Sequence, residues 1–422
     1  MKKLITPIIL IVLITGCSQE DSPRYPHYEI ELSLLPASQH IAVTGTWEIP
    51  VDPATSTIDF HLHKQLEIED LLVNGSDDYR LSAGKSDIRY MPDARKYSIE
   101  TGDSLKGTIT ISFNYSGTIT EWNDMIANVI GEEWTEMGLY FPWFPYNTAY
   151  SPFTYEVKVL TEKDYHTVMM GHETKDDNYV IFRKKTPTND IVVCASKDLK
   201  IISKEISRYN FTLAHCSMSD NLTDTLVTDV ERILRLFNRW FPSGNKTICI
   251  VESMREKGGG YARLGGIFLP GFTQSDYFES RKAYTRYLAH EISHLWWYRA
   301  NTNTWEDWLN EGFAEYSALM VLRELHGPEY FDEWITRKEK NVENAGPVWH
   351  TDRNGNQAHT ILYDKAPLLL YELEGRIGID SMKQLMWDLN IKKVSDTGEF
   401  MDMLEACEGK ETAEWFLDRL KS

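Results

Sequence analysis

The stretch HEISHLWWYRANTNTWEDWLNEGFAEY, residues 290–316, contains two segments with helical patterns joined by a short polar loop. Residues four apart in an α-helix lie on one face, roughly 6 Å apart along the axis, so His290 and His294 can present two imidazole nitrogens to one ion. Glu291 is rotated by roughly 100° from His290 and would not bind that ion directly. It can instead reach a water molecule at an open coordination position and accept its proton as a general base.

A carboxylate from the second segment would complete the ligand set. Glu311 fits this position, and Glu315, one turn further on, can accept a hydrogen bond from the far nitrogen of a ligand histidine. Zinc suits such ligands and lowers the pKa of its bound water to about 7. A chance HExxH on a surface helix would not explain the second glutamate. A structural zinc site would close all four positions, usually with Cys or His. We therefore predict one catalytic Zn²⁺ per chain.

Charge and composition limit the possible partners. The formal net charge of the chain is −19, which disfavours nucleic acid, whose phosphates would be repelled. At the N-terminus, residues 1–17 read as a positive segment, a short apolar run and then Ile14-Thr15-Gly16-Cys17. This resembles a bacterial lipoprotein signal with Cys17 as the acylated residue, although an ordinary secretory signal with a chance cysteine is the alternative.

Export would permit disulfides among the other cysteines. Cys194 and Cys216 both lie in strand-like runs and form the most plausible pair, whereas Cys249 has the surroundings of a buried free thiol. Cys407 completes the set. The chain contains no C-x-x-C motif, so these cysteines are expected to be structural.

The residue pattern changes along the chain. Residues 18–27 are polar and proline-containing, as in a tether, and residues 28–205 alternate or run apolar over strand lengths. Residues 206–422 are mainly helical in pattern, with a buried strand and a Gly-rich strand-and-turn near residues 247–270. We therefore expect an α+β chain, with an N-terminal all-β domain followed by a mainly helical catalytic domain.

The motifs WLNEGFAEY and HEISHLWW resemble those of the membrane-alanyl-aminopeptidase family, the zinc peptidases of the aminopeptidase N type. The segments TIDFHLHKQLEIEDLLVNG and YFPWFPYNTAYSPFTYEVKV extend the resemblance over most of residues 28–390. It implies a saddle-shaped β domain, a thermolysin-like catalytic domain and peptide hydrolysis with zinc. The large C-terminal helical domain of typical members has no counterpart, so we expect a short form with a more open cleft, or one covered by another chain.

The resemblance also assigns a tyrosine. Tyr363-Asp364-Lys365 is similar to the Y-E-K-G segment of the family, which implies that Tyr363 stabilises the oxyanion of the tetrahedral intermediate. Without the family, Tyr363 would be an ordinary amphipathic tyrosine and Tyr371 an equal candidate.

Two departures concern the zinc spacing and substrate binding. The spacer between His294 and Glu311 has sixteen residues where the family has eighteen, a shortening that falls in a loop. The G-x-M-E-N motif, whose glutamate holds the substrate amine, is replaced by GGGYARLGG.

This segment suggests other substrate contacts. Gly259 and Gly260 would allow an extended peptide to approach, beside Tyr261. Arg263 is either a carboxylate-binding group or a surface arginine. Glu136, or Glu133, would be the amine anchor if it is not a solvated loop carboxylate.

Together these features predict a zinc metallopeptidase, most plausibly an aminopeptidase, with a peptide substrate and a lipid-anchored location. An endopeptidase of the same fold and a non-catalytic peptide-binding lipoprotein are the alternatives. Ser18 after Cys17 favours the outer membrane, facing the periplasm or the cell surface.

Overall fold

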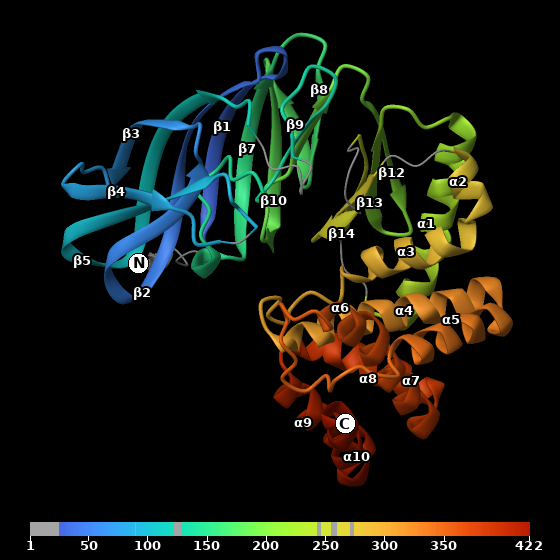
Figure 1. Cartoon of the computed structure of the whole chain (residues 1–422). Coiled ribbons are helices and arrows are strands. Elements are labelled where there is room, and N and C mark those ends of the chain that lie inside the picture. The colour runs from blue at the N-terminus through green and yellow to red at the C-terminus, as the bar shows by residue number, and fades with distance from the viewer. Residues whose placement is uncertain (1–24, 89, 122–127, 243–245, 255–259, 271–273) are drawn as a thin grey trace, which may run out of the picture.

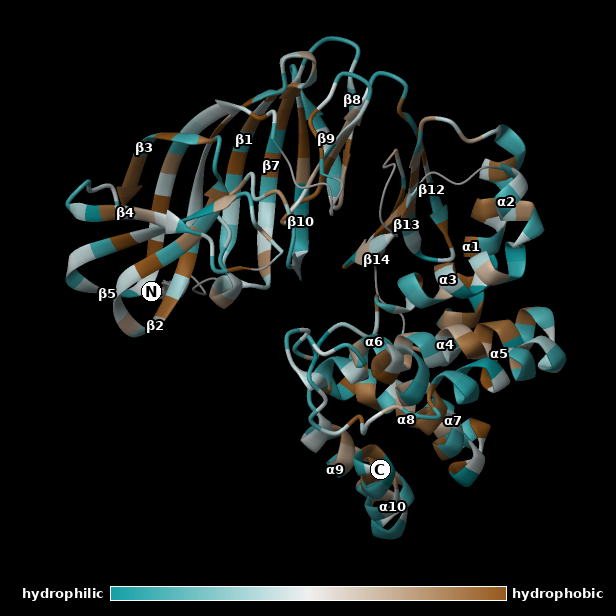
Figure 2. Ribbon diagram, viewed as in Figure 1, coloured by the Kyte–Doolittle hydropathy of each residue, from teal (hydrophilic) through white to brown (hydrophobic). Residues whose placement is uncertain are grey.

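The computed structural model describes residues 25–88, 90–121, 128–242, 246–254, 260–270 and 274–422. Figure 1 shows a strand-rich part formed by the first half of the chain, a smaller sheet beside it, and layers of helices below that sheet. In Figure 2 the strands carry alternating hydrophobic and hydrophilic bands, as expected for sheets with one buried face.

The N-terminal part is built on a large sheet in the order β3-β5-β2-β1-β7-β10-β9, with β4 also paired to β5. Its strands are β1 (His27–Leu35), β2 (His40–His63), β3 (Glu67–Val73), β4 (Tyr79–Lys85), β5 (Ala94–Thr118), β7 (Phe153–Thr161), β9 (His172–Asp176) and β10 (Tyr179–Thr188). Alternate residues of β1 are buried, and β1 pairs antiparallel with β2 and parallel with β7. A small second sheet, β6-β11-β8, contains β6 (Thr135–Met137), β8 (His166–Met169) and β11 (Val193–Ser196).

The second part begins with a sheet in the order β12-β13-β14-β16-β15. Its strands are β12 (Lys200–Ile206), β13 (Tyr209–His215), β14 (Lys246–Ser253), β15 (Tyr261–Arg263) and β16 (Gly266–Pro270). The central strands are parallel, and β15 pairs antiparallel with β16 at one edge. The change of sheet falls between Ser196 and Lys200, close to the domain boundary expected after residue 205.

Helices cover this sheet and continue to the C-terminus. They are α1 (Asp220–Trp240), α2 (Gln274–Glu279), α3 (Arg281–Ser293), α4 (Trp308–His326), α5 (Pro328–Asn341), α6 (Ala358–Thr360), α7 (Ala366–Ile377), α8 (Ile379–Lys392), α9 (Thr397–Glu408) and α10 (Lys410–Lys421). Ser219 caps α1 by accepting a hydrogen bond from the backbone N–H of Leu222. The buried face of α1 packs with β13, β14, α3 and α4 in one hydrophobic core. The expected fold class is confirmed.

Two details differ from what the sequence predicted, and a third concerns membrane-spanning helices. The helix expected over residues 281–300 ends at Ser293, because the chain turns at His294 to begin the connection to α4. The cysteines Cys194, Cys216, Cys249 and Cys407 are not joined in disulfides in the described structure, so the expected Cys194–Cys216 disulfide is not formed. Of the helices that the structure describes, none is long and apolar enough to cross a membrane.

Candidate active site

The two histidines and Glu311 converge between α3 and α4. The Nδ1 atom of His294 donates to the carbonyl of Trp297, 2.8 Å away, which leaves its Nε2 atom free to face Glu311. Nε2 of His290 and Nε2 of His294 lie 3.3 Å and 3.6 Å from the same atom, Oε2 of Glu311. Both imidazoles therefore present the same kind of nitrogen to one carboxylate oxygen.

These donors fit a zinc ion. Ligand atoms at tetrahedral corners around zinc, with bonds of about 2.0–2.2 Å, are separated by roughly 3.3–3.6 Å. The Glu311 Oε2 atom is also buried without a hydrogen-bond partner among the described residues, a costly arrangement unless a cation satisfies it. Ligand atoms of His290, His294 and Glu291 also lie within 4.8 Å of one another. Glu311 is the candidate third ligand, because its Oε2 atom approaches both Nε2 atoms and has no other partner among the described residues.

Glu315 lies behind this site at the centre of a buried network. It accepts a hydrogen bond from Nδ1 of His290 at 3.0 Å, the contact expected from the sequence. Burial raises its pKa, but the charges of Lys338 and Arg286 and the His290 contact outweigh burial and hold the pKa of Glu315 well below its usual range. Lys338 also donates to the backbone carbonyl of Tyr363 at 2.8 Å. One network therefore orients His290 and fixes the backbone of the candidate oxyanion tyrosine.

Tyr363 lies directly beside the histidines. It sits in a π-helical turn (Ile361–Lys365), a local irregularity often found at functional sites. Its ring lies parallel to the rings of His290 and of His359, with centroid distances of 5.6 Å and 4.5 Å. Tyr371, the alternative from sequence, instead contacts Phe331. The structure thus separates two tyrosines that local pattern could not.

Burial raises the pKa of Glu291, which favours its uptake of a proton. Burial also raises the pKa of the Tyr363 hydroxyl, and the nearby charges of Glu311 and Asp307 add to this, so it remains a hydrogen-bond donor. Burial also raises the pKa of Glu311, but the adjacent imidazoles of His294 and His290 and the Tyr363 hydroxyl outweigh burial and lower that pKa to about 2. The site thus combines a proton acceptor, a donor and an ionised ligand.

Four charged residues at the site were not anticipated from the sequence. Arg286 and Lys338 flank Glu315, and Arg353 donates to Asp307 at 2.7 Å. Asp307 precedes Glu311 by one helical turn, so its spacing was a usable signal. The other three approach from α3, from α5 and from the loop after α5, and no local pattern marks them.

The residues expected to bind substrate through their side chains occupy a closed cluster beside β15. Glu136 is 0% exposed, and its carboxylate accepts hydrogen bonds from Trp134, Ser253 and Tyr261. Arg263 is buried against Asp190, which accepts its Nε–H at 2.7 Å. Glu136 is therefore not a solvated loop carboxylate and Arg263 is not a surface arginine, because each is enclosed by partners from other strands, and these partners occupy the groups that were expected to bind substrate.

The expected pairing of an extended peptide with the backbone of this segment is compatible with the structure. β15 is an edge strand, so its outer side is not paired within the described sheet. A Cβ atom at Gly260 would lie 1.9 Å from the hydroxyl oxygen of Tyr287, so the glycine permits close packing on α3. Gly259 and Cys17 lie outside the described residues.

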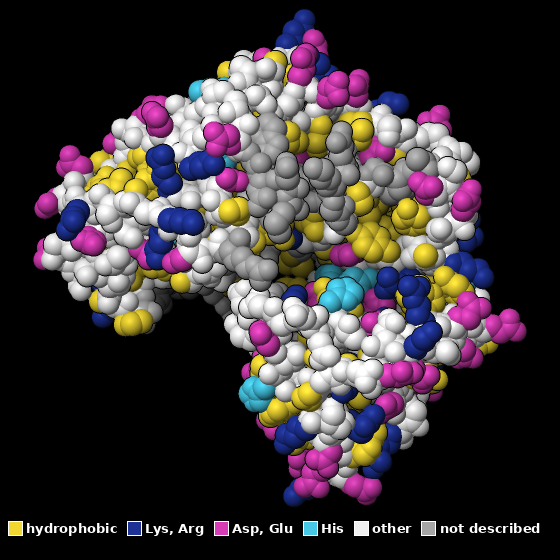
Figure 3. Space-filling model, viewed as in Figure 1, with side chains coloured by type: hydrophobic (Ala, Val, Ile, Leu, Met, Phe, Trp, Pro, Cys, Tyr) yellow, Lys and Arg dark blue, Asp and Glu magenta, His cyan; other side chains and the backbone are white. Residues whose placement is uncertain are grey.

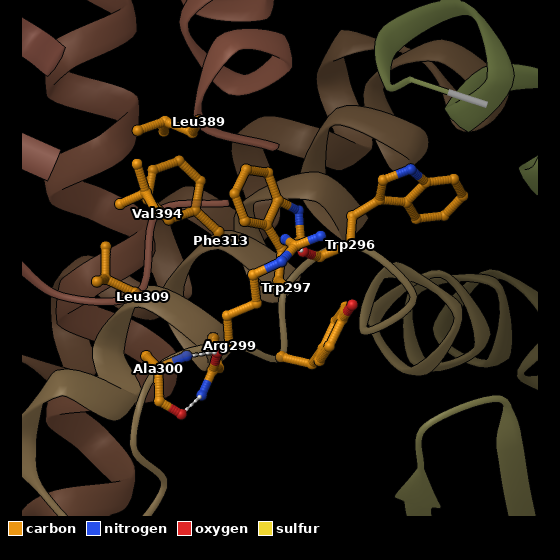
Figure 4. Close-up of a pocket in the computed structure, with 10 residues that line it drawn as sticks. Trp296, Trp297, Arg299, Ala300, Leu309, Phe313, Leu389 and Val394 are labelled. Carbon is orange, nitrogen blue, oxygen red and sulfur yellow. Dashed lines mark hydrogen bonds between the residues drawn. The ribbon is translucent and has the colours of Figure 1, made fainter. Parts of the chain in front are cut away.

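Aromatic residues around the site mainly build the core. Trp296, Trp297 and Trp308 are buried, and Trp297 stacks on Phe313. Figure 4 shows a small cavity lined by Trp296 and Trp297 and by Leu389 and Val394 from α8 and the turn after it. The backbone of Ala300 exchanges two hydrogen bonds with the Asn310 side chain there. Figure 3 shows a group of histidine side chains in the hollow between the strand-rich part and the helices, and single histidines elsewhere on this face.

Comparison with known proteins yields the same architecture. No protein-family profile matches this chain. The chain is 31% identical over 138 residues to leucine aminopeptidase 2-1 of Meyerozyma guilliermondii, and 29% identical over 136 residues to leucine aminopeptidase 2 of Pyricularia oryzae. Each match covers 28% of this chain and only 22% of the relative.

Solved structures match almost the whole chain. An M1 zinc metallopeptidase from Deinococcus radiodurans superposes with a TM-score of 0.71 at 15% identity, covering 94% of this chain and 93% of that one. A mutant of it was solved with a Tyr-Ser-Ala substrate. Leukotriene A4 hydrolase from Saccharomyces cerevisiae gives a TM-score of 0.71 at 18% identity, covering 93% of this chain and 66% of that one. The chain therefore has the fold of the M1 zinc metallopeptidases.

Proposed function

We propose that this protein is a zinc-dependent M1-type metallopeptidase that removes residues from the amino terminus of peptides. The observation that carries the proposal is the approach of His290 Nε2 and His294 Nε2 to one orphaned oxygen of Glu311. These three residues would hold the zinc ion. The ion would supply Lewis-acid polarisation of the substrate carbonyl and a lowered pKa for water.

The side chains around the ligands supply the remaining chemistry. Glu291 accepts the proton of the attacking water and transfers it to the leaving amine, a role that its raised pKa favours. Tyr363 donates its hydroxyl hydrogen to the oxyanion that develops on the scissile carbonyl. Glu315 holds the ring of His290 in the orientation that directs Nε2 toward Glu311.

The substrate backbone would bind along β15. This edge strand can pair with an extended peptide through backbone hydrogen bonds, as in β-strand addition. The curated relatives are named leucine aminopeptidases, which supports cleavage from the amino terminus. Because Glu136 is enclosed, another group must hold the substrate amine if this specificity is correct.

The test uses the full chain, loaded with zinc in detergent, and one peptide series with free, amino-blocked or carboxyl-blocked ends. Mass spectrometry should show stepwise loss from the free amino terminus, and Glu291→Gln should reduce turnover by about 10²- to 10⁴-fold. Internal cuts that ignore blocking would identify an endopeptidase. Absence of any cleavage with one zinc bound per chain would favour the peptide-binding lipoprotein.

We also propose that the protein is exported and acylated at Cys17, with the outer membrane as its location. The sequence around Cys17 is the support for this proposal. Incorporation of labelled fatty acid in cells should be lost in Cys17→Ser, with membrane association lost as well. Labelling that persists in the variant would contradict it.

A further inference from the structure

Arg353 is held at the edge of the candidate site by one buried carboxylate. It lies in the loop between α5 and α6, and its side chain is 29% exposed. Its Nε–H donates to Asp307 Oδ2 at 2.7 Å, and Asp307 is 1% exposed. Asp307 lies one turn before Glu311, so this ion pair positions a guanidinium near the candidate zinc ligand Glu311.

The ion pair uses only part of the guanidinium. The second oxygen of Asp307, Oδ1, already accepts a hydrogen bond from Asn310 at 2.9 Å. Among the described residues, Nη1 and Nη2 of Arg353 have no hydrogen-bond partner. Arg323 shows the contrast, since its two Nη atoms donate to both oxygens of Glu374 at 2.7 Å and 2.9 Å. Arg353 thus keeps a pair of adjacent N–H groups available.

The free groups lie close to the reacting centre. Asp307 directly precedes α4, and Glu311 lies in the first turn of that helix, so the guanidinium that donates to Asp307 at 2.7 Å lies within about one helical turn of the candidate zinc ligand. A guanidinium presents its paired N–H groups in a planar fork that matches a carboxylate in a bidentate contact. An amide or a backbone carbonyl offers only one acceptor atom to such a fork.

We propose that Arg353 binds the C-terminal carboxylate of short peptide substrates and so gives the site a preference for di- and tripeptides. This inference rests on the proposed peptidase function and adds a substrate class to it. One extended residue spans roughly 3.3–3.6 Å, so an arginine paired with Asp307, one turn before Glu311, reaches a carboxylate only within a few residues of the scissile bond. The preference should decline as the peptide lengthens beyond that distance.

The test compares an Ala-Ala-Ala peptide with its C-terminal amide, using the zinc-loaded full chain. The measured quantity is the ratio of kcat/KM for the free acid to kcat/KM for the amide. We expect Arg353→Met to lower this ratio by about 10- to 100-fold, the usual effect of losing a hydrogen bond between charged groups. Arg353→Lys, which keeps a charge beside Asp307 but lacks the fork, should give an intermediate ratio.

Arg323→Met is the matched control. Arg323 is similarly exposed, at 26%, and also pairs with a largely buried carboxylate, but it lies at the far end of α4. Its substitution should leave the acid-to-amide ratio unchanged. An unchanged ratio in Arg353→Met, or an equal fall in Arg323→Met, would overturn the proposal.

Two further arms separate the other outcomes. An amidated peptide with Asp in place of the last Ala tests for a side-chain carboxylate, and if only this peptide responds to Arg353→Met the terminal carboxylate is excluded. Calorimetric binding of the free acid and the amide to Glu291→Gln, with and without Arg353→Met, measures recognition without turnover. If no variant cleaves peptides, the peptidase proposal fails, whereas a binding preference that depends on Arg353 still supports this inference.

Discussion

Two clusters of buried carboxylates, one beside β15 and one between α3 and α4, differ in how their oxygens are satisfied. In the first, beside β15, Glu136 accepts from three side chains, and Asp190 accepts from Arg263 and from the backbone N–H of Leu139. In the second, between α3 and α4, Glu311 Oε2 has no hydrogen-bond donor among the described residues and faces two imidazole nitrogens.

The difference shows which acidic residues serve the fold. A buried carboxylate whose oxygens all have donors is stabilised where it is and has little capacity for a ligand. A buried carboxylate with an oxygen left over is costly unless a cation is supplied. We therefore interpret the first cluster as a structural link between sheets and the second as a binding site.

Neutralising one carboxylate in each cluster should produce the largest difference between the two clusters. Glu311→Gln should lose more zinc affinity than the roughly 10- to 100-fold typical of outer-shell changes, because a direct ligand loses its charge. Glu136→Gln should keep its zinc and instead lose about 1–3 kcal/mol of unfolding free energy, since one buried donor loses its acceptor. Metal analysis after dialysis and urea unfolding measure the two effects. Zinc loss in Glu136→Gln would remove the distinction.

Substituting Glu315 should weaken zinc binding and also lower stability, because Glu315 joins the site to the core. Glu315→Gln should weaken zinc binding by about 10- to 100-fold through the loss of the His290 contact. It should also cost about 3 kcal/mol of stability, since the buried charge of Lys338 loses one of its two carboxylate partners. Zinc titration and thermal unfolding of the metal-free protein separate the two. An unaltered zinc affinity would show that the hydrogen bond does not tune the ligand.

Lys184 provides a pH-dependent test on the structural side. Burial lowers its pKa from 10.5 to about 8, and its ammonium group donates to the carbonyl of Leu264 in the turn between β15 and β16. Protonation of Lys184 is therefore less favourable in the folded state than in the unfolded state. The buried charge destabilises the fold fully below about pH 8 and not at all above pH 10.5. As the pH rises from about 8 to 10.5, the unfolding free energy of the wild-type protein should increase by about 3 kcal/mol relative to that of Lys184→Met. Urea unfolding at both pH limits measures it, and parallel curves for the two proteins would contradict the assignment.

Ser253→Ala should give the smallest effect. It removes one of the hydrogen bonds to Glu136, while Trp134 and Tyr261 continue to donate to that carboxylate. We expect a loss of about 1–2 kcal/mol in unfolding free energy with no change in zinc content. A fall in zinc content would mean that the two clusters are coupled.

The regular elements of the fold followed well from local pattern, with instructive exceptions. The four-residue spacing of His290 and His294 predicts a shared helical face, and the residues do meet at one point. Where the expected helix was too long, the chain had to turn at His294 to return toward Glu311. The Cys194–Cys216 pairing failed because both residues have strand-like surroundings whatever their neighbours in space.

The sequence by itself determined the chemistry that depends on residues close along the chain. Helical periodicity aligns His290 with His294 and Glu311 with Glu315, so ligand types and spacing were readable without a structure. Only the tertiary structure decided which other charged residues are available. Glu136 and Arg263 are enclosed by partners from distant strands, Tyr363 lies in a π-helical turn against His290, and Arg353 reaches Asp307 from a loop. Burial and pairing depend on the partners that folding brings together, and these are distant in sequence.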